Sequence, residues 1–128
     1  MSAGYPSENP FHHAAWRTYT PADGLPGLLV DHIDQDADGF LWFTTVHGGA
    51  CRFDGEEFRT FTPQEGLPRG RVTCLLRDSR DRLWLAMQEG KSCWYDGREF
   101  HPFDEFEYSR GVVQCMMEDR EGRIWFWG

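Results

Sequence analysis

The chain repeats itself with a period of 42 residues, and a third copy follows at an offset of 41. The segments that coincide are spread over the whole unit: Tyr19-Thr20-Pro21 with Phe61-Thr62-Pro63, Leu41-Trp42 with Leu83-Trp84, and Phe53-Asp54-Gly55 with Tyr95-Asp96-Gly97. In the third copy, Ile124-Trp125 takes the place of Leu83-Trp84. Repeats of this length are typical of solenoids, propellers and linear arrays.

The second unit has the pattern of four antiparallel strands. Short runs of apolar and β-branched residues alternate with polar turns. Asp96-Gly97 indicates a hairpin, because glycine supplies the positive φ that such turns need. Pro102 indicates an edge strand, where a missing N–H costs least. The four predicted strands are 71–78, 82–87, 91–96 and 98–103.

Four strands in a unit of this length are the signature of a propeller blade. We therefore predict an all-β fold, a partial β-propeller of about three four-stranded antiparallel blades. Three blades do not close a ring, since closed propellers need at least about four. We expect a fragment of a longer protein, with several copies closing one ring together as the alternative. The expected parts are a flexible leader (1–15), an isolated outer strand (16–20), a first repeat (21–62), a second (63–103) and an incomplete third (104–128).

Composition narrows the classes of partner. Thirteen basic and 21 acidic residues give a net charge of −8, which argues against binding to a nucleic-acid backbone. No apolar run reaches the roughly 18 residues of a membrane span, so no membrane contact is predicted for this segment. The four cysteines form no C-x-x-C pair, and we interpret them as small buried residues. No cofactor is predicted.

The stretch D-Q-D-A-D-G begins like an EF-hand calcium loop. Its twelfth position is a threonine, where such a loop needs a bidentate glutamate. Of its three carboxylates, only Asp36 has an aspartate at the equivalent position of both other repeats, Asp78 and Asp119. We interpret these three as caps of a turn. Calcium bound by Asp34, Asp36 and Asp38 is the weaker alternative.

Trp42, Trp84 and Trp125 recur on the predicted second strand of each unit. A large ring at this position fills the wedge between two twisted sheets, so we expect these residues to pack between neighbouring blades. Stacking on carbohydrate is the less favoured interpretation.

At this level of detail the unit resembles the two-component regulator propeller repeat, which runs as G-L-P, V-x-x-I, D-x-x-G, L-W, G-G and Y-D-G. The first copy matches in order through Leu25-Pro26, Val30, Ile33, Asp36, Gly39, Leu41-Trp42, Thr44, Gly48-Gly49 and Phe53-Asp54-Gly55. The resemblance covers residues 16–128. It is weaker in the third copy, which lacks the Gly-Leu-Pro triplet.

The resemblance implies a sensor β-propeller of bacterial hybrid histidine kinases. The expected function is a non-catalytic sensor or ligand-binding segment of a bacterial two-component signalling receptor, with any kinase activity on a longer parent chain. A scaffold for protein–protein interaction is the alternative, and a propeller polysaccharide lyase or glycosidase is less favoured. The family implies a periplasmic or extracytoplasmic location, although the chain shows no signal peptide and the cytoplasm stays open.

The loops that open on one face of such a propeller carry the candidate ligand-binding side chains. A guanidinium forks onto a carboxylate, so we expect an oligosaccharide or a small anionic ligand there. The other expected partners are the missing blades of the same propeller or a second copy of the chain. The candidate residues are Arg69, Arg71, Arg110, His47 and Gln88.

Overall fold

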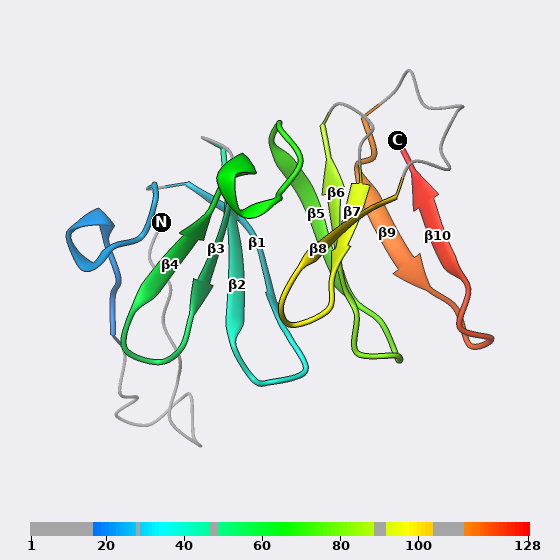
Figure 1. Cartoon of the computed structure of the whole chain (residues 1–128), viewed down its shortest axis with the longest axis horizontal. Coiled ribbons are helices and arrows are strands. Elements are labelled where there is room, and N and C mark those ends of the chain that lie inside the picture. The colour runs from blue at the N-terminus through cyan, green and yellow to red at the C-terminus, as the bar shows by residue number, and fades with distance from the viewer. Residues whose placement is uncertain (1–16, 28, 47–48, 89–91, 104–111) are drawn as a thin grey trace.

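The computed structural model describes residues 17–27, 29–46, 49–88, 92–103 and 112–128. Within these ranges ten strands form three antiparallel sheets, two of four strands and one of two, arranged side by side as an open arc (Figure 1). The strands of each sheet follow one another in chain order. The predicted all-β partial propeller is confirmed.

The strand bounds agree closely with the repeat. The first sheet contains β1 (Val30–Gln35), β2 (Leu41–Thr45), β3 (Ala50–Phe53) and β4 (Phe58–Phe61). The second contains β5 (Val72–Arg77), β6 (Leu83–Met87), β7 (Ser92–Tyr95) and β8 (Phe100–Phe103), and the third contains β9 (Cys115–Glu118) and β10 (Ile124–Trp127). β8 lies at the edge of its sheet, as Pro102 predicted. The first strands of the three sheets lie next to one another, β1 against β5 and β5 against β9.

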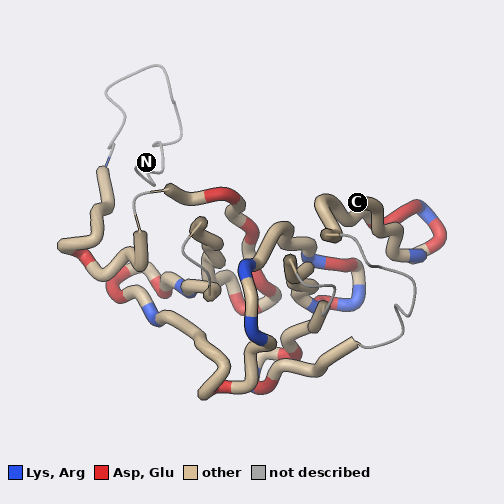
Figure 2. Tube along the Cα trace, turned by 90° about the horizontal axis from the view of Figure 1, so that it is seen from above, with Lys and Arg blue, Asp and Glu red and all other residues tan. Residues whose placement is uncertain are grey.

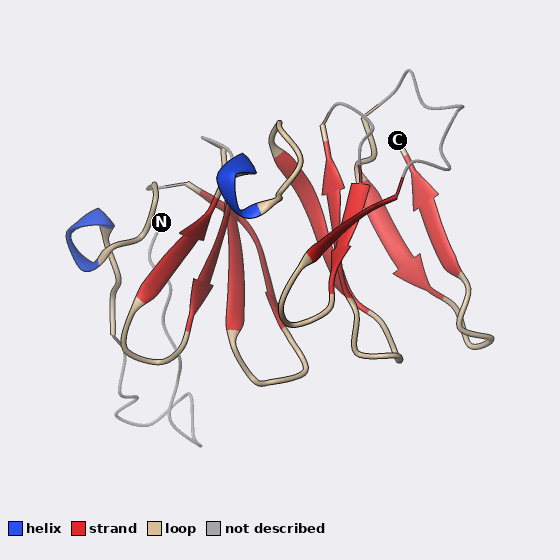
Figure 3. Ribbon diagram, viewed as in Figure 1, coloured by secondary structure: helices blue, strands red, loops and turns tan. Residues whose placement is uncertain are grey.

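Two features differ from the prediction. Residues 17–20 belong to the expected outer strand, but the structure assigns them no strand. Two short 3-10 turns, η1 (Pro21–Asp23) and η2 (Pro63–Glu65), follow the paired threonine positions instead (Figure 3). In η2 the Glu65 carboxylate accepts the Thr62 amide at 2.6 Å, and Gly66 ends the turn at φ 94°. None of the described helices is long and apolar enough to cross a bilayer.

One aspartate organises each turn between a first and a second strand. In the second sheet, Asp78 Oδ1 accepts the amides of Arg80 and Arg82, each at 2.9 Å. Its other oxygen, Oδ2, accepts the indole N–H of Trp84 at 2.8 Å. Asp36 bonds Trp42 and Asp119 bonds Trp125 in the same way, at 2.7 and 2.8 Å. The aspartate therefore fixes both the turn and the ring that follows it.

The charge of Asp78 is favoured by these partners. Burial acts to raise the pKa of its carboxyl group, but the indole of Trp84 and the amide and guanidinium of Arg82 together hold that pKa below its usual value. The fourth residue of the turn has a left-handed backbone in every sheet. This residue is Gly39, Asp81 or Gly122, with φ of 88°, 62° and 78°.

Side chains of the sheets alternate between two faces. We call the face toward the preceding sheet the leading face, and the face toward the following sheet the trailing face. Along β6, Leu83, Leu85 and Met87 pack against the first sheet, whereas Trp84 and Ala86 pack against the third. This is the period of two that a strand imposes.

The seam between the first two sheets is aromatic. Trp42 from the trailing face of the first sheet is fully buried. It stacks on Phe61 of its own sheet at 5.0 Å between ring centroids, and contacts Tyr95 at 4.9 Å and Phe100 at 6.2 Å across the seam. In the second seam, Trp84 contacts Phe103 of its own sheet at 5.4 Å between ring centroids and Phe126 of the third sheet at 6.0 Å.

The third tryptophan differs from the expectation. Trp125 lies on the trailing face of the third sheet and is 52% exposed. No sheet packs beyond β10 within the described part of the chain, so the ring has no neighbour to fill the wedge. The packing of this tryptophan depends on what lies next to its sheet.

Removing the Asp78 carboxylate is expected to destabilise the fold. Asp78→Ala leaves the buried indole N–H of Trp84 without its acceptor, which costs about 2 kcal/mol of unfolding free energy. Urea unfolding at neutral pH, followed by circular dichroism, measures the loss. The matched control is Asp119→Ala, which breaks the same bonds around a half-exposed ring that water reaches. An equal loss for both variants would contradict the role of burial.

Candidate ligand-binding groove

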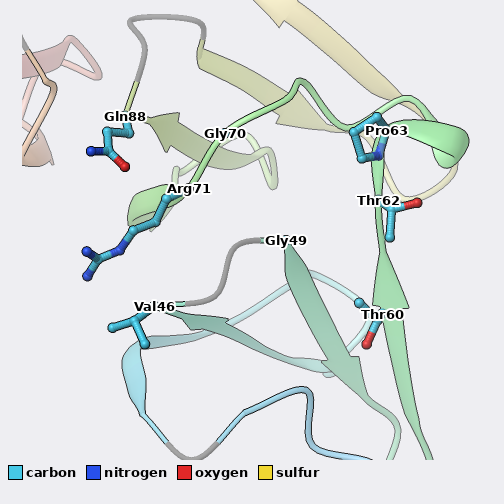
Figure 4. A pocket seen from close by; sticks show the side chains of 8 residues that line it. All are labelled: Val46, Gly49, Thr60, Thr62, Pro63, Gly70, Arg71 and Gln88. Carbon is cyan, nitrogen blue, oxygen red and sulfur yellow. The ribbon is translucent and has the colours of Figure 1, made fainter.

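Two hollows share the side chains of Arg71 and Gln88 and together form one groove. The groove lies at the end of the second sheet where β5 begins and β6 ends. The first has a volume of about 510 Å³, and the second about 360 Å³. In the first, Arg71, Gln88 and Val46 lie on one side, with Thr60, Thr62 and Pro63 across from them (Figure 4). Asp31, His32, Thr73, Val112 and Gln114 line the second hollow together with Arg71 and Gln88.

The strand pairing of the second sheet brings Arg71 and Gln88 together. Arg71 immediately precedes β5 and Gln88 immediately follows β6, and the Gln88 amide donates to the Arg71 carbonyl at 2.8 Å. Gly49 supplies backbone to the wall opposite. Its φ is 76°, and a Cβ there would lie 3.1 Å from the Phe61 carbonyl, so the wall at this point requires glycine.

The groove crosses the boundary between sheets. The guanidinium of Arg71 donates to Asp31 Oδ2 of the first sheet, from Nη2 at 2.5 Å and from Nε at 3.2 Å. The two side chains are 39% and 23% exposed. Arg71 is therefore an oriented, partly neutralised donor, and its remaining N–H groups are available to a ligand.

Asp31, Thr73 and Gln114 occupy the equivalent position of the three repeats, and all three line the second hollow. The hydroxyl of Thr73 donates to the carbonyl of Val113, which lies just before β9 of the third sheet. Asp31 and Thr73 lie near the starts of β1 and β5, and Gln114 immediately precedes β9, so each of the three repeats contributes one polar side chain to this hollow. The sequence signal was the repeat itself, because equivalent positions of adjacent blades face one axis, but sequence reasoning named none of the three.

The predicted ligand-binding residues differ in their position relative to the groove. Arg71 and Gln88 lie in the groove. Arg69 is exposed and lines neither hollow. His47 and Arg110 lie outside the described residues.

The aspartates of the calcium-like stretch have other partners. Asp34 accepts the amides of Gln35 at 2.7 Å and of Arg77, on the second sheet, at 3.1 Å. Asp36 is occupied by its turn and by Trp42. Among the described residues, this stretch is not one of the groups of side chains placed to hold a metal ion. The turn-capping interpretation accounts for the bonds of Asp36 to the amides of Asp38 and Phe40.

A different cluster does bring metal-ligand side chains together. Asp96, Glu99 and His101 sit on the β7–β8 hairpin with ligand atoms within 4.8 Å of one another. Asp96 Oδ2 lies 2.7 Å from His101 Nε2, and the imidazole stacks on Trp94 at 4.1 Å. The hydrogen bond to His101 is the main reason why the pKa of Asp96 is lowered to about 2, and the amides of Glu99 and Arg98 contribute to the same effect.

The cysteines are free thiols, and three of them are buried. Burial raises the pKa of Cys51 to about 11 and that of Cys93 to about 12, so neither forms a reactive thiolate near neutral pH. Burial also raises the pKa of Cys74, and Cys115 on the third sheet adds to the effect. Cys74 and Cys115 occupy equivalent positions on the first strands of adjacent sheets.

Acidic residues are distributed along the whole arc (Figure 2), in keeping with the net charge of −8. Arg71 is therefore one of a minority of cations, and it lies at the groove. A groove of mixed polarity within an acidic molecule suits a small ligand better than a polyanionic backbone.

The comparisons with known proteins agree with this fold. The family model described as two component regulator propeller matches residues 66–89 and 107–126. The first segment contains β5 and β6, and the second contains β9 and all of β10 except its last residue. No curated protein shows significant similarity to the chain.

The pair of Asp96 and His101 in the β7–β8 hairpin gives a prediction for stability at acidic pH. Because the pKa of Asp96 is lowered in the folded state, its contribution to stability is present above the unfolded value and is lost as the pH falls toward about 2. His101→Ala is expected to move the pKa of Asp96 back toward 3.8. Carboxyl-carbon NMR shifts followed through a pH titration measure the change.

Asp54 is the matched internal control, because its pKa is lowered by the amides of Glu57 and Glu56, with no histidine nearby in its hairpin. Its titration should be unchanged in His101→Ala. An Asp96 titration that does not move would show that the histidine contributes nothing.

Proposed function

Because two of its repeats match the two component regulator propeller model, the chain belongs to that family of propeller repeats, and we propose that it is a ligand-binding sensor segment of a two-component signalling receptor. The observation that carries the proposal is the groove that joins the sheets at Arg71. A ligand there contacts more than one blade, so its binding changes how firmly the blades hold together. That is the kind of differential contact a sensor needs.

The lining favours a hydroxylated or anionic small molecule. Thr60, Thr62 and Gln88 offer hydroxyl and amide groups, which both donate and accept. Arg71 adds a guanidinium oriented by Asp31. We propose an oligosaccharide or a small anionic ligand, in a periplasmic or extracytoplasmic setting as in the receptors that the repeat resembles.

The segment is proposed to be non-catalytic. Glycoside hydrolysis uses two carboxyl groups that flank the scissile bond. Among the described residues that line the two hollows, Asp31 is the only one with a carboxylate. This carboxylate forms an ion pair with Arg71. This supports binding rather than turnover.

A thermal-shift panel of neutral and acidic oligosaccharides tests the proposal, with isothermal titration of any hit. Arg71→Ala and Gln88→Ala are each expected to weaken binding about tenfold or more, the ratio that corresponds to 1.4 kcal/mol. Both variants should keep the wild-type circular dichroism spectrum.

Arg80→Ala is the matched control, because Arg80 is an exposed arginine on the turn at the other end of β5. It should leave affinity unchanged. Equal loss in Arg71→Ala and Arg80→Ala would show non-specific charge attraction. No shift across the panel, together with capture of a folded protein partner, would favour the scaffold function.

A further inference from the structure

The hairpin between β7 and β8 brings an imidazole and two carboxylates together at the end of the second sheet opposite the groove. Asp96, Glu99 and His101 place their ligand atoms within 4.8 Å of one another. Tyr95, the residue before the turn, pairs with Leu83 at the start of β6, whereas the groove lies where β6 ends. The cluster is therefore separate from the groove.

Two of the three side chains are held in place by their surroundings. Asp96 Oδ1 accepts the amides of Arg98 and Glu99, each at 2.7 Å. Its Oδ2 lies 2.7 Å from His101 Nε2, and the imidazole stacks on the indole of Trp94 with 4.1 Å between ring centroids. Interactions that orient a ligand side chain in this way strengthen metal binding.

The hairpin carries negative charge that its own ion pairs do not neutralise. A Cβ built on Gly97 would lie 3.7 Å from Asp38 Oδ2 on the β1–β2 turn, so a third carboxylate lies beside the hairpin. Among the described residues, no ion pair involves Arg98, Glu99 or Asp38. The carboxylates of Glu99 and Asp38 are thus available to attract a cation to this end of the sheet.

The first repeat shows what the histidine replaces. Its β3–β4 hairpin keeps both carboxylates, and Asp54 accepts turn amides in the same way, each at 2.8 Å. The equivalent of Glu99 there is Glu57, but the equivalent of His101 is Arg59. A guanidinium has a fixed positive charge and no acceptor atom, whereas a neutral imidazole can bind a metal. The second hairpin therefore has a metal ligand where the first has a cation.

We propose that Asp96, Glu99 and His101 form a binding site for one divalent transition-metal ion of the Zn²⁺ type. The imidazole favours such an ion over Ca²⁺ and Mg²⁺, which prefer oxygen ligands alone. Water completes the coordination, as at zinc sites with three protein ligands. His101 binds the ion through unprotonated Nε2, so the ring proton lies on Nδ1.

The bound ion fixes the edge of the second sheet. Asp96 follows β7, whereas His101 lies on β8, the edge strand of the sheet. An ion held by both side chains links the edge strand to its neighbour and stabilises the folded hairpin by mass action. Metal binding there does not require a ligand in the groove.

NMR of the whole chain with paramagnetic Co²⁺, which accepts the same ligands as Zn²⁺, tests the site residue by residue. Equimolar Co²⁺ is expected to shift or broaden the amide signals of Arg98 and Glu99. The amide signals of Glu56 and Glu57 in the first hairpin should not change. Zn²⁺ is expected to displace Co²⁺ from the site, and a large excess of Ca²⁺ is not.

The repeat supplies the variants. His101→Arg installs the residue of the first hairpin and is expected to abolish the effect of Co²⁺ on the Arg98 and Glu99 signals. Glu99→Gln should weaken binding about tenfold or more, whereas Glu57→Gln, the matched control, should leave affinity unchanged. Each substitution changes an exposed or half-exposed side chain, so the circular dichroism spectra should match wild type.

Three results would overturn the proposal. Equal Co²⁺ effects on both hairpins would assign the binding to carboxylates alone. An effect on the Arg98 amide that survives in His101→Arg would exclude the histidine as a ligand, and displacement by Ca²⁺ as readily as by Zn²⁺ would exclude a transition-metal site. Unchanged wild-type spectra at equimolar Co²⁺ would show that the hairpin binds no such ion, which overturns the proposal as well.

Discussion

The hydrogen bond from an indole N–H to a turn aspartate is the interaction on which the remaining structure depends. The aspartate holds the turn between first and second strands through backbone amides, and its second oxygen holds the ring six residues later. A tryptophan on a strand carries a polar atom into the seam, which is costly unless that atom is bonded. The aspartate removes this cost. It also fixes which face of the second strand becomes the trailing face.

From that bond the seams follow. With the indole on the trailing face, the period of two along each strand places aliphatic residues on the leading face of the same sheet. Each seam then joins one indole to the aliphatic and aromatic side chains of the next sheet. Polar bonds reinforce the seams at their rims, such as Arg77 N to Asp34 and Ser79 to Glu118. Each repeat therefore carries the residues that form its packing contact with the next repeat.

The repeat predicted the strands, the hairpins and the edge position of Pro102, because these depend on local spacing and turn chemistry. It predicted the turn aspartates but missed their bond to the indole, which joins residues on separate elements. The hairpin pair of Asp96 and His101 was also missed, since Arg59 holds the histidine's place in the first repeat. Exposure was the least predictable property. Trp125 is equivalent to Trp84 in sequence, yet only the presence of a neighbouring sheet buries the ring.

The positions around the groove follow a different rule from those in the seams. Arg71 is replaced by Leu29 in the first repeat and by Val112 in the third, and Gln88 is replaced by Val46. Seam residues must fit partners that are themselves repeated, so packing restricts them to a narrow set of sizes. Groove residues at the ends of the strands face solvent or ligand, so packing does not restrict them. A repeat protein can therefore keep one architecture while each blade presents different chemistry at the axis, and in this chain the second blade presents the arginine.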